Sequence, residues 1–396
     1  MGDTRFLSGK TAIAGIGATD FSKDSGRSEL MLAVQAVTAA AEDAGISPSE
    51  IDGLVTFTMD TNPEIAVARE LGIKELNLFS KIHYGGGAGG GTILQAAMAI
   101  ASGVADVVCC YRAFNERSGR RFGAGIHDAP ATSSTEQSQY AWTSPYGQVT
   151  PASWVAMFAQ RYLHVYGATT EAFGHVAVAD RKHASNNPAA HFYNRPITME
   201  DHQSSRWIVN PLRLLDCCQE TDGGQAIIVT SAERARDLKS TPAIIASVAQ
   251  GSWKDQFSMT SFYRPDDEMV GIPEMGLVAR RLYEQAGLGP SDIQTAVLYD
   301  HFTPFVLCQL EEFGFCGRGE APDFVAGGNI EIGGGLPVNT HGGQLGEAYL
   351  HGMNGIAEGV RQVRGTSVNQ VPDVANVVVT AGTGVPTSGL ILSADG

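Results

Sequence analysis

The spacing of apolar residues divides the chain into alternating strands and helices. Residues 9–17 form an apolar run typical of a buried strand, and residues 28–45 repeat apolar side chains at helical spacing. Ser28 is a candidate N-cap for this helix, and Gly45 is a candidate C-terminal stop. Because residues 51–57 return as a strand, the chain is predicted to open with a strand, helix, strand unit.

The same pattern occurs again in the second half of the chain. Residues 44–52 and 286–294 both run from a helix end through a Pro-Ser turn to an acidic residue and an isoleucine, at an offset of 286 − 44 = 242. Although a coincidental match is an alternative, this constant offset favours an internal duplication. Two similar α/β halves are therefore expected, each with one sheet and its own helices.

Glycine-rich turns are predicted at strand ends and helix starts. The glycine run at 83–92 enters an apolar helix at 94–103, but it lacks the Gly-Lys-Ser/Thr ending of a phosphate loop. The strand at 374–384 ends in a glycine turn, where open α/β folds usually bind their ligands. Residues 339–355 hold five glycines and lead into a helix at 356–364. This stretch is either a catalytic corner, in which glycine lets the backbone approach a ligand, or a plain turn.

The middle of the chain is less regular. It carries aromatic residues, arginines and histidines without tight ligand spacing, so no metal site is expected there. We interpret it as a cap or loop domain inserted in the first half. The predicted organisation is residues 1–115 as the first part of the N-terminal half, 116–240 as the loop domain with the return to that half, and 241–396 as the C-terminal half.

Composition narrows the classes of function. With 396 residues, 43% hydrophobic and 17% charged, the chain can bury a large core. The formal net charge of -15 argues against sequence-independent binding to nucleic acid or to an anionic membrane surface. The first residues do not resemble a signal peptide and no apolar run is long enough to span a membrane, so a cytoplasmic enzyme is expected.

The six cysteines lack the C-x-x-C spacing of zinc sites and redox dithiols. They are expected to be buried, inert thiols. They are Cys109, Cys110, Cys217, Cys218, Cys308 and Cys316.

The chain resembles the thiolase superfamily, in particular its lipid-transfer-protein or sterol-carrier-protein branch. The resemblance covers the opening strand, the helix that ends in Asp-Ala-Gly, the Gly-Val-Ala-Asp block at 103–106, the duplicated halves and the terminal glycine turn. It implies a five-layered αβαβα fold built from two duplicated halves with an inserted loop domain. It also implies a homodimer formed through the N-terminal half, and acyl-CoA as the ligand.

The catalytic positions depart from those of thiolases. Gly87 stands where that family has its nucleophilic cysteine, and Thr380 stands where it has the acid/base cysteine. The two family histidines are replaced by Tyr299 and Tyr349. Thiolysis needs a covalent acyl-enzyme, so a working thiolase is not expected. A retro-aldol cleavage of a 3-hydroxyacyl-CoA needs only a base, an oxyanion site and an acid.

The Tyr-Asp-His-Phe and Gly-Glu-Ala-Tyr patterns are similar to those of the thiolase-like aldolases of bacterial sterol side-chain degradation. That resemblance implies cleavage of a 17-hydroxy steroid carboxyl-CoA thioester to a 17-ketosteroid and propionyl-CoA. It further implies a heterotetramer with a small partner protein built from a zinc ribbon and an OB-fold. The CoA thioester is the substrate, and no bound cofactor, nucleic acid or membrane is implied.

The resemblance makes Tyr299 and Tyr349 the acid/base pair, in either order, if the site lowers the pKa of one phenol. His341 either contributes to the oxyanion site or caps the glycine turn, and the arginines either bind the CoA phosphates or belong to a solvated face. The candidate catalytic and supporting residues are Tyr299, Tyr349, His341, Asp300, His301 and Glu347; the oxyanion or substrate-binding candidates are Gly342, Gly343, Gly87, Thr380 and Gly382; and the CoA-binding candidates are Arg117, Arg120 and Arg121.

Two alternatives remain beside the aldolase. A thiolase or acyltransferase with an unexpected nucleophile would need Cys308 or Cys109 in the pocket. The second alternative is a non-catalytic lipid-CoA binding subunit, because a protein can keep its fold after it has lost the catalytic nucleophile.

Overall fold

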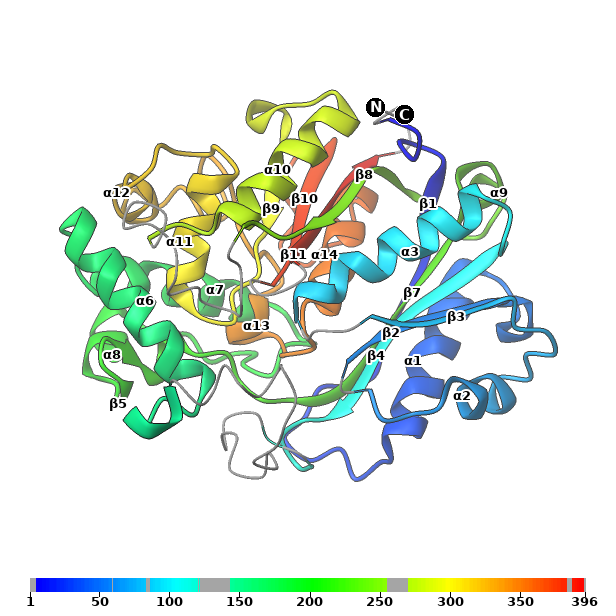
Figure 1. Ribbon diagram of the computed structural model, residues 1–396, viewed down its shortest axis with the longest axis horizontal. Helices are drawn as coiled ribbons and strands as arrows, with labels where there is room; N and C mark the ends of the chain where they lie inside the picture. Colours follow the sequence, from blue (N-terminus) through cyan, green and yellow to red (C-terminus); the bar gives the residue numbers. More distant parts are fainter. Residues whose placement is uncertain are drawn as a thin grey trace.

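The structure is a computed structural model of the chain (Figure 1) that describes residues 5–58, 60–82, 86–119, 121, 143–254, 270–382 and 387–394. Within these residues no helix has both the length and the apolar character needed to cross a membrane.

One large mixed sheet runs through the molecule, with the strand order β3-β2-β4-β7-β1-β8-β11-β10-β9. The strands are β1 (Thr11–Ala18), β2 (Gly53–Phe57), β3 (Leu78–Ile82), β4 (Val107–Asn115), β7 (Asp222–Ser231), β8 (Ala243–Gly251), β9 (Thr295–Val297), β10 (Asn376–Ala381) and β11 (Thr387–Ala394). The N-terminal half supplies the five strands from β3 to β1, and the C-terminal half supplies the other four. The halves meet where β1 pairs with β8, at Ala12–Ile244 and Ile13–Ala243.

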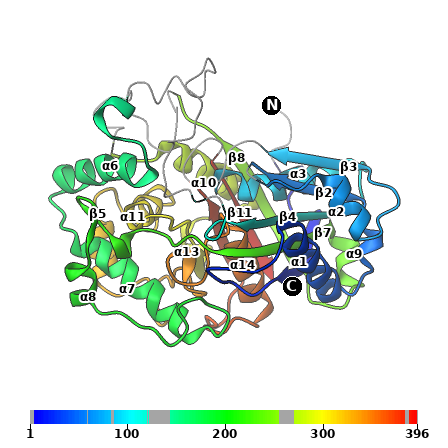
Figure 2. The ribbon, with the colours of Figure 1, turned by 90° about the horizontal axis from the view of Figure 1, so that it is seen from below.

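Helices cover the sheet on both faces and also fill the space between its two halves (Figures 1 and 2). The longer helices are α1 (Glu29–Ala44), α3 (Gly89–Ala101), α6 (Pro151–Tyr166), α7 (Glu171–Asn186), α10 (Pro273–Ala286), α11 (Thr303–Glu312) and α14 (Met353–Arg364). The short helices are α2 (Glu64–Glu70), α8 (Met199–Ser204), α9 (Ala232–Arg236), α12 (Ala321–Ala326) and α13 (Gly343–Gly346). Single 3-10 turns are η1 (Pro48–Glu50), η2 (Gly86–Ala88), η4 (Ser144–Tyr146), η5 (Leu214–Asp216) and η6 (Pro290–Asp292), and β5 (Trp207–Val209) pairs with β6 (Leu212–Arg213).

Alternate strand side chains face different helical layers, as the two-residue period of a strand requires. On β4, Cys109 packs with α1 while Cys110 packs with α3 and α14. On β10, Val379 faces the same central layer and Val378 faces α10 and α11. The N-terminal and C-terminal parts of the one sheet therefore form two separate layers. The order of layers is helix, sheet, helix, sheet, helix, which confirms the predicted αβαβα fold.

The internal repeat is visible in the structure. Gly45 ends α1 at a φ of 78°, and Gly287 ends α10 at a φ of 72°, again 287 − 45 = 242 residues apart. Each glycine is followed by a 3-10 turn, η1 and η6, before the chain enters the sheet. The side chain of Ser28 accepts a hydrogen bond from the N–H of Met31, so the predicted N-cap of α1 is confirmed.

The segment between β4 and β7 packs over the outer face of the C-terminal half. Figure 1 shows α6, α7 and α8 beside α11 and α12, and the buried Tyr162 and Phe173 belong to the same apolar cluster as α11. A buried His202 Nε2 lies 2.7 Å from Asp216 Oδ1, and Thr303 Oγ1 donates a hydrogen bond to that oxygen at 2.8 Å. These contacts fix the start of α11, next to the residues that follow β9.

The two edges of the sheet differ. The edge strand β3 pairs along its whole length with β2, and its Phe79 side chain is 62% exposed. At the other edge β9 has three residues, and Ala296 forms a parallel bridge with Val338 on its outer side.

Candidate active site

Two tyrosines from distant segments meet at one end of the C-terminal half. Tyr299 follows β9 and Tyr349 lies between α13 and α14. Their hydroxyl oxygens are 3.4 Å apart, within hydrogen-bonding distance. The structure therefore brings together the two residues that the sequence assigned as an acid/base pair.

Thr380 and Gln309 hold the backbone of Tyr299. The Tyr299 N–H donates to Thr380 Oγ1 at 2.8 Å, and Thr380 Oγ1 donates in turn to Gln309 Oε1 at 2.5 Å. Gln309 Nε2 donates to the Tyr299 carbonyl at 2.9 Å. Thr380 was predicted to contact substrate. In the structure its hydroxyl holds the backbone of Tyr299, which lines the cavity.

Three glycines allow the segments around Tyr299 to touch. A Cβ at Gly86 would overlap the Tyr299 hydroxyl, and a Cβ at Gly382 would overlap the backbone of Gly87. Gly382 also has a φ of 56°, which side chains other than glycine adopt rarely. Gly87 and Gly382, both predicted site residues, thus lie against each other beside Tyr299, just before the first turn of α3.

A cavity of about 650 Å³ opens onto the two phenols. Besides Tyr299 and Tyr349 its wall includes the predicted His301 and two residues that the sequence did not single out, His351 and Glu116. Four cationic side chains also line it, and these are Lys23, Arg117, Arg121 and Arg206. Arg117 and Arg121 are thus placed where an anionic part of a ligand could reach them, whereas Arg120 lies outside the described residues.

Burial keeps the centre of the cavity neutral. It raises the pKa of both phenols well above their usual value near 10, and the hydrogen bond from Tyr349 only partly offsets this for Tyr299. Burial also lowers the pKa of His301 to about 3 and holds that of His351 well below its usual range. At neutral pH the two tyrosines are protonated and the two histidines are uncharged.

Asp300 joins the Tyr299 segment to the glycine corner. Its carboxylate accepts hydrogen bonds from the N–H groups of Gln344 at 2.9 Å and Leu345 at 3.0 Å. A Cβ at Gly343 would overlap the Asp300 carboxylate, so glycine is required at this contact. Asp300 therefore ties the Tyr299 segment to the start of α13, and its supporting role in catalysis stays a prediction.

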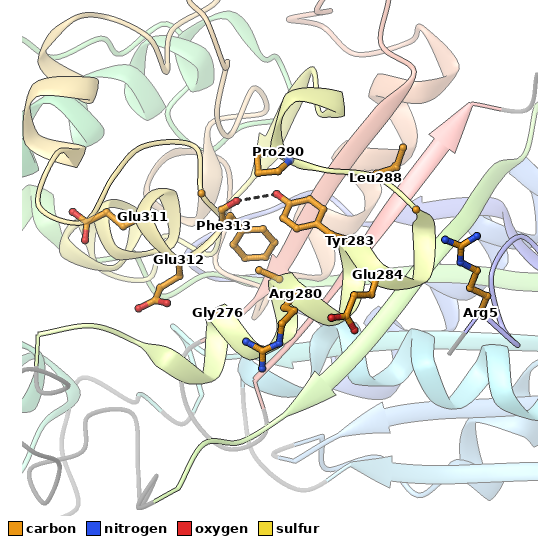
Figure 3. Close-up of a pocket in the computed structure, with 13 residues that line it drawn as sticks. Arg5, Gly276, Arg280, Tyr283, Glu284, Leu288, Pro290, Glu311, Glu312 and Phe313 are labelled. Carbon is orange, nitrogen blue, oxygen red and sulfur yellow. Dashed lines mark hydrogen bonds between the residues drawn. The ribbon is translucent and has the colours of Figure 1, made fainter. Parts of the chain in front are cut away.

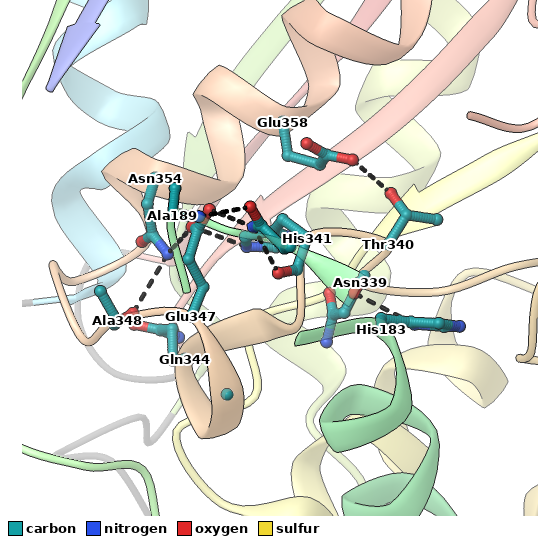
Figure 4. Close-up of polar contacts among 12 residues, drawn as sticks. His183, Ala189, Asn339, Thr340, His341, Gln344, Glu347, Ala348, Asn354 and Glu358 are labelled. Carbon is teal, nitrogen blue, oxygen red and sulfur yellow. Dashed lines mark hydrogen bonds and ion pairs between the residues drawn. The ribbon is translucent and has the colours of Figure 1, made fainter. Parts of the chain in front are cut away.

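His341 and Glu347 belong to one network of polar contacts (Figure 4). His341 Nε2 is 3.9 Å from Glu347 Oε2, and Asn187 Nδ2 donates to the Glu347 carboxylate and to the His341 carbonyl, both at 3.0 Å. Asn354 Nδ2 donates to Glu347 Oε2 at 2.9 Å. A Cβ at Gly342 would overlap Ala184 of α7. His341, Gly342 and Gly343 do not line the tyrosine cavity, and their oxyanion role stays a prediction.

The cysteines that an acyl-enzyme would require are elsewhere. Cys109 and Cys308 are buried in separate apolar clusters and neither lines the cavity. Cys217 and Cys218 do line it, which their spacing in the sequence did not indicate. Burial raises the pKa of both of these thiols, which disfavours the reactive thiolate.

A second, more open cleft of about 740 Å³ lies between α10 and α11 (Figure 3). Its wall includes Arg280, Tyr283 and Glu284, and the Tyr283 hydroxyl donates a hydrogen bond to the Phe313 carbonyl at 3.1 Å. It contains no residue that the sequence predicted to be catalytic. The smaller tyrosine cavity is therefore the candidate active site.

Comparisons with known proteins point to the same kind of chemistry. Residues 11–233 match the family described as "Thiolase, N-terminal domain", and residues 264–393 match "Thiolase C-terminal domain-like". The chain is 68% identical to the steroid side-chain-cleaving aldolase of Thermomonospora curvata, over 98% of this chain and 99% of that protein. It is 67% identical to the 17-hydroxy-3-oxo-4-pregnene-20-carboxyl-CoA lyase of Mycobacterium tuberculosis, over 98% of this chain and 100% of that protein.

A solved structure described as "Ltp2-ChsH2(DUF35) aldolase" superimposes with a TM-score of 0.94. It is 67% identical in sequence, and the alignment covers 98% of this chain and 99% of that chain. At this similarity the arrangement of helices and strands described above is shared over nearly the full length.

Proposed function

The chain belongs to the thiolase family, and from this premise we propose that it is an aldolase that cleaves a 17-hydroxy steroid carboxyl-CoA thioester. The products are a 17-ketosteroid and propionyl-CoA, which follow from breaking the bond between C17 and the carbon next to the thioester. The observation that carries the proposal is the full-length identity to two relatives named for this reaction. The tyrosine pair in the cavity is consistent with it.

The tyrosine pair supplies the proton transfers of a retro-aldol cleavage. One phenol oxygen takes the proton of the C17 hydroxyl while its own proton leaves toward the other phenol, the C17 carbonyl forms, and the electrons of the broken bond pass into a thioester enolate. The other phenol donates its proton to the enolate carbon. Because the two hydroxyl groups are hydrogen-bonded at 3.4 Å, a proton can pass between them and restore the starting state.

The enolate oxygen needs hydrogen-bond donors. Gly87 lies two residues before α3, and the first N–H groups of a helix of 13 residues have no partners within the helix. One of them, the Gly91 N–H, donates to Ser388 Oγ at 3.1 Å. Gly382 packs against the same backbone. We assign Gly87 and Gly382 to the oxyanion site because they adjoin Tyr299.

The cationic side chains that line the cavity are suited to bind the phosphates of CoA. Arg121 Nε lies 2.6 Å from Glu220 Oε2 and remains 48% exposed, so its guanidinium can still face a ligand. Together with Arg117 it offers positive charge to an otherwise acidic protein. Arg121→Ala should raise the KM for the CoA thioester about tenfold at low salt with kcat unchanged, since the contact is made in the ground state and the transition state alike.

The proposed assembly is a homodimer joined to a second protein. The related solved structure is described as a complex with a DUF35 protein, and we propose a zinc-ribbon and OB-fold partner of that kind in a heterotetramer. The open edge of β3, with its exposed Phe79, supports a homodimer through the N-terminal half.

The test is an incubation of the purified chain, alone and with its DUF35-type partner, with the 17-hydroxy steroid carboxyl-CoA and no free CoA. The expected products are propionyl-CoA and the 17-ketosteroid, at a rate that iodoacetamide does not change. Tyr299→Phe and Tyr349→Phe should each lower kcat by about 10²-fold or more.

Two results would instead support the alternatives. Cleavage of a 3-ketoacyl-CoA that requires free CoA would show a thiolase. Steroid-CoA binding without cleavage, unchanged in both Phe variants, would show a binding subunit.

A further inference from the structure

Among the described residues that line the tyrosine cavity, neither histidine is a strong base, because burial lowers the pKa of both His301 and His351. A phenol accepts a proton from the C17 hydroxyl only if its own proton can leave, and burial raises the pKa of both phenols. The nearby histidines are held neutral, but His301 packs face to face on Phe305 with ring centroids 4.8 Å apart, so its ring lies against the apolar core. A base of suitable strength must therefore be sought elsewhere in the cavity wall.

Glu116 has the position that such a base requires. It follows the last residue of β4, is 1% exposed, and lines the same cavity as Tyr299 and Tyr349. Its Oε1 atom is buried and has no hydrogen-bond partner among the described residues. By contrast, both carboxylate oxygens of Asp300 and both of Glu347 accept hydrogen bonds. Glu116 is thus a buried carboxyl group in the cavity wall whose Oε1 atom makes no hydrogen bond within the described part of the chain.

Burial raises the pKa of this carboxyl group well above its usual range, and nearby cations partly offset that effect. Arg112 on β4 is fully buried, and its three guanidinium nitrogens have no hydrogen-bond partner in the described part of the chain. Arg112 and Lys23 favour the Glu116 carboxylate, whereas Glu220 and Asp222 oppose it.

Intrinsic acidity decides which group in the cavity ionises first. A carboxyl group is about six pKa units more acidic than a phenol in water. Burial raises the pKa of all three groups. Glu116 starts from the greater acidity and is therefore the group in the cavity suited to exchange a proton with a phenol.

We propose that Glu116 is the proton acceptor of the tyrosine pair. This inference rests on the proposed aldolase function and adds a residue to it. As the bond between C17 and the α-carbon breaks, one phenol takes the hydroxyl proton, and its own proton moves across the cavity that both groups line to the Glu116 carboxylate. The second phenol protonates the enolate carbon. The proton on Glu116 then returns through the first phenol to the second, so no proton is gained or lost in a cycle.

The experiment measures kcat, KM and the pH dependence of kcat for Glu116→Gln on the steroid-CoA thioester, in the complex with the partner. Glutamine keeps the size of the side chain but cannot accept the proton. The matched control is Glu311→Gln, because Glu311 is another carboxyl group beside a tyrosine, with its Oε1 atom 2.5 Å from the Tyr162 hydroxyl, but it lies outside the cavity. Affinity for the 17-deoxy CoA thioester, which cannot react, reports whether the cavity remains intact.

We expect Glu116→Gln to lower kcat by about 10²-fold or more with unchanged affinity for the 17-deoxy thioester, and the control to match the wild type. The wild-type kcat should fall as acid protonates Glu116, and this fall should be absent from the residual activity of the variant. If Glu116→Gln does not fold, Glu116→Ala with added formate should recover activity that formate does not increase in the wild type.

A Glu116→Gln variant with the kcat and pH profile of the control would overturn the inference, and so would an Ala variant that folds but gains nothing from formate. An inactive wild type would instead count against the proposed function, so the two failures are distinguishable.

Discussion

Replacing Thr380 by valine tests whether this residue anchors the catalytic tyrosine. Valine has nearly the same shape but lacks the hydroxyl that accepts from the Tyr299 N–H at 2.8 Å and donates to Gln309 Oε1 at 2.5 Å. Two buried hydrogen bonds are lost at about 1 kcal/mol each. Gln309 Oε1 is 3.3 Å from the same N–H and can take over part of its hydrogen bonding. The free energy of unfolding should therefore fall by about 2 kcal/mol.

The assay is urea unfolding followed together with kcat. A shift of Tyr299 by a fraction of an ångström should also lower kcat, by as much as about 10²-fold if the phenol moves 1 Å. Thr380→Ser is the control, because it keeps the hydroxyl and loses a single methyl group worth about 0.8 kcal/mol, and it should retain kcat. If the valine variant unfolds at the wild-type urea concentration and keeps its kcat, the anchoring role is refuted.

Three further predictions follow from contacts around the site. Gly86→Ala places a Cβ onto the Tyr299 hydroxyl and should lower kcat by about 10²-fold while the protein still folds; a wild-type kcat would show that the phenol can move aside freely. Asp216→Asn breaks the buried contact with His202 at 2.7 Å and should lower the free energy of unfolding by about 3 kcal/mol, measured in urea, and an unchanged midpoint would count against it. Burial lowers the pKa of His301 from 6.5 to about 3, so the unfolded chain binds this proton first and stability should decrease as pH falls through that range. His301→Phe should make the urea midpoints at about pH 7 and about pH 4 more alike, and an equal difference in both proteins would contradict this.

The elements with local signals were predictable from the sequence. Ser28 marks the start of α1 because its side chain caps the helix, and Gly45 marks the end because glycine readily adopts the left-handed conformation found there. The repeat at an offset of 242 residues indicated two similar halves. Tyr299 and Tyr349 were assigned from the resemblance to thiolases, and the structure places them together.

Burial and cavity walls were not predictable, because they depend on segments far apart in the chain. Glu116 is a single carboxylate after a strand, and its environment is created by residues near 23, 220, 299 and 349. Cys218 enters the cavity wall because its N–H donates to the His301 carbonyl at 2.9 Å, a contact between two segments. His341 lies outside the cavity because Gly342 packs on α7, and the sequence does not show that neighbour.

The unequal edges of the sheet limit how copies of the chain can associate through their strands. If both edge strands of a sheet had free N–H and C=O groups, copies of the chain could pair edge to edge one after another and form a fibre. Here β3 is open, whereas the outer side of the three-residue β9 is already occupied at Ala296 by Val338. Pairing of β3 with β3 about a two-fold axis consumes the open edge of both copies. In the homodimer proposed above, growth along the sheet would therefore terminate at two chains.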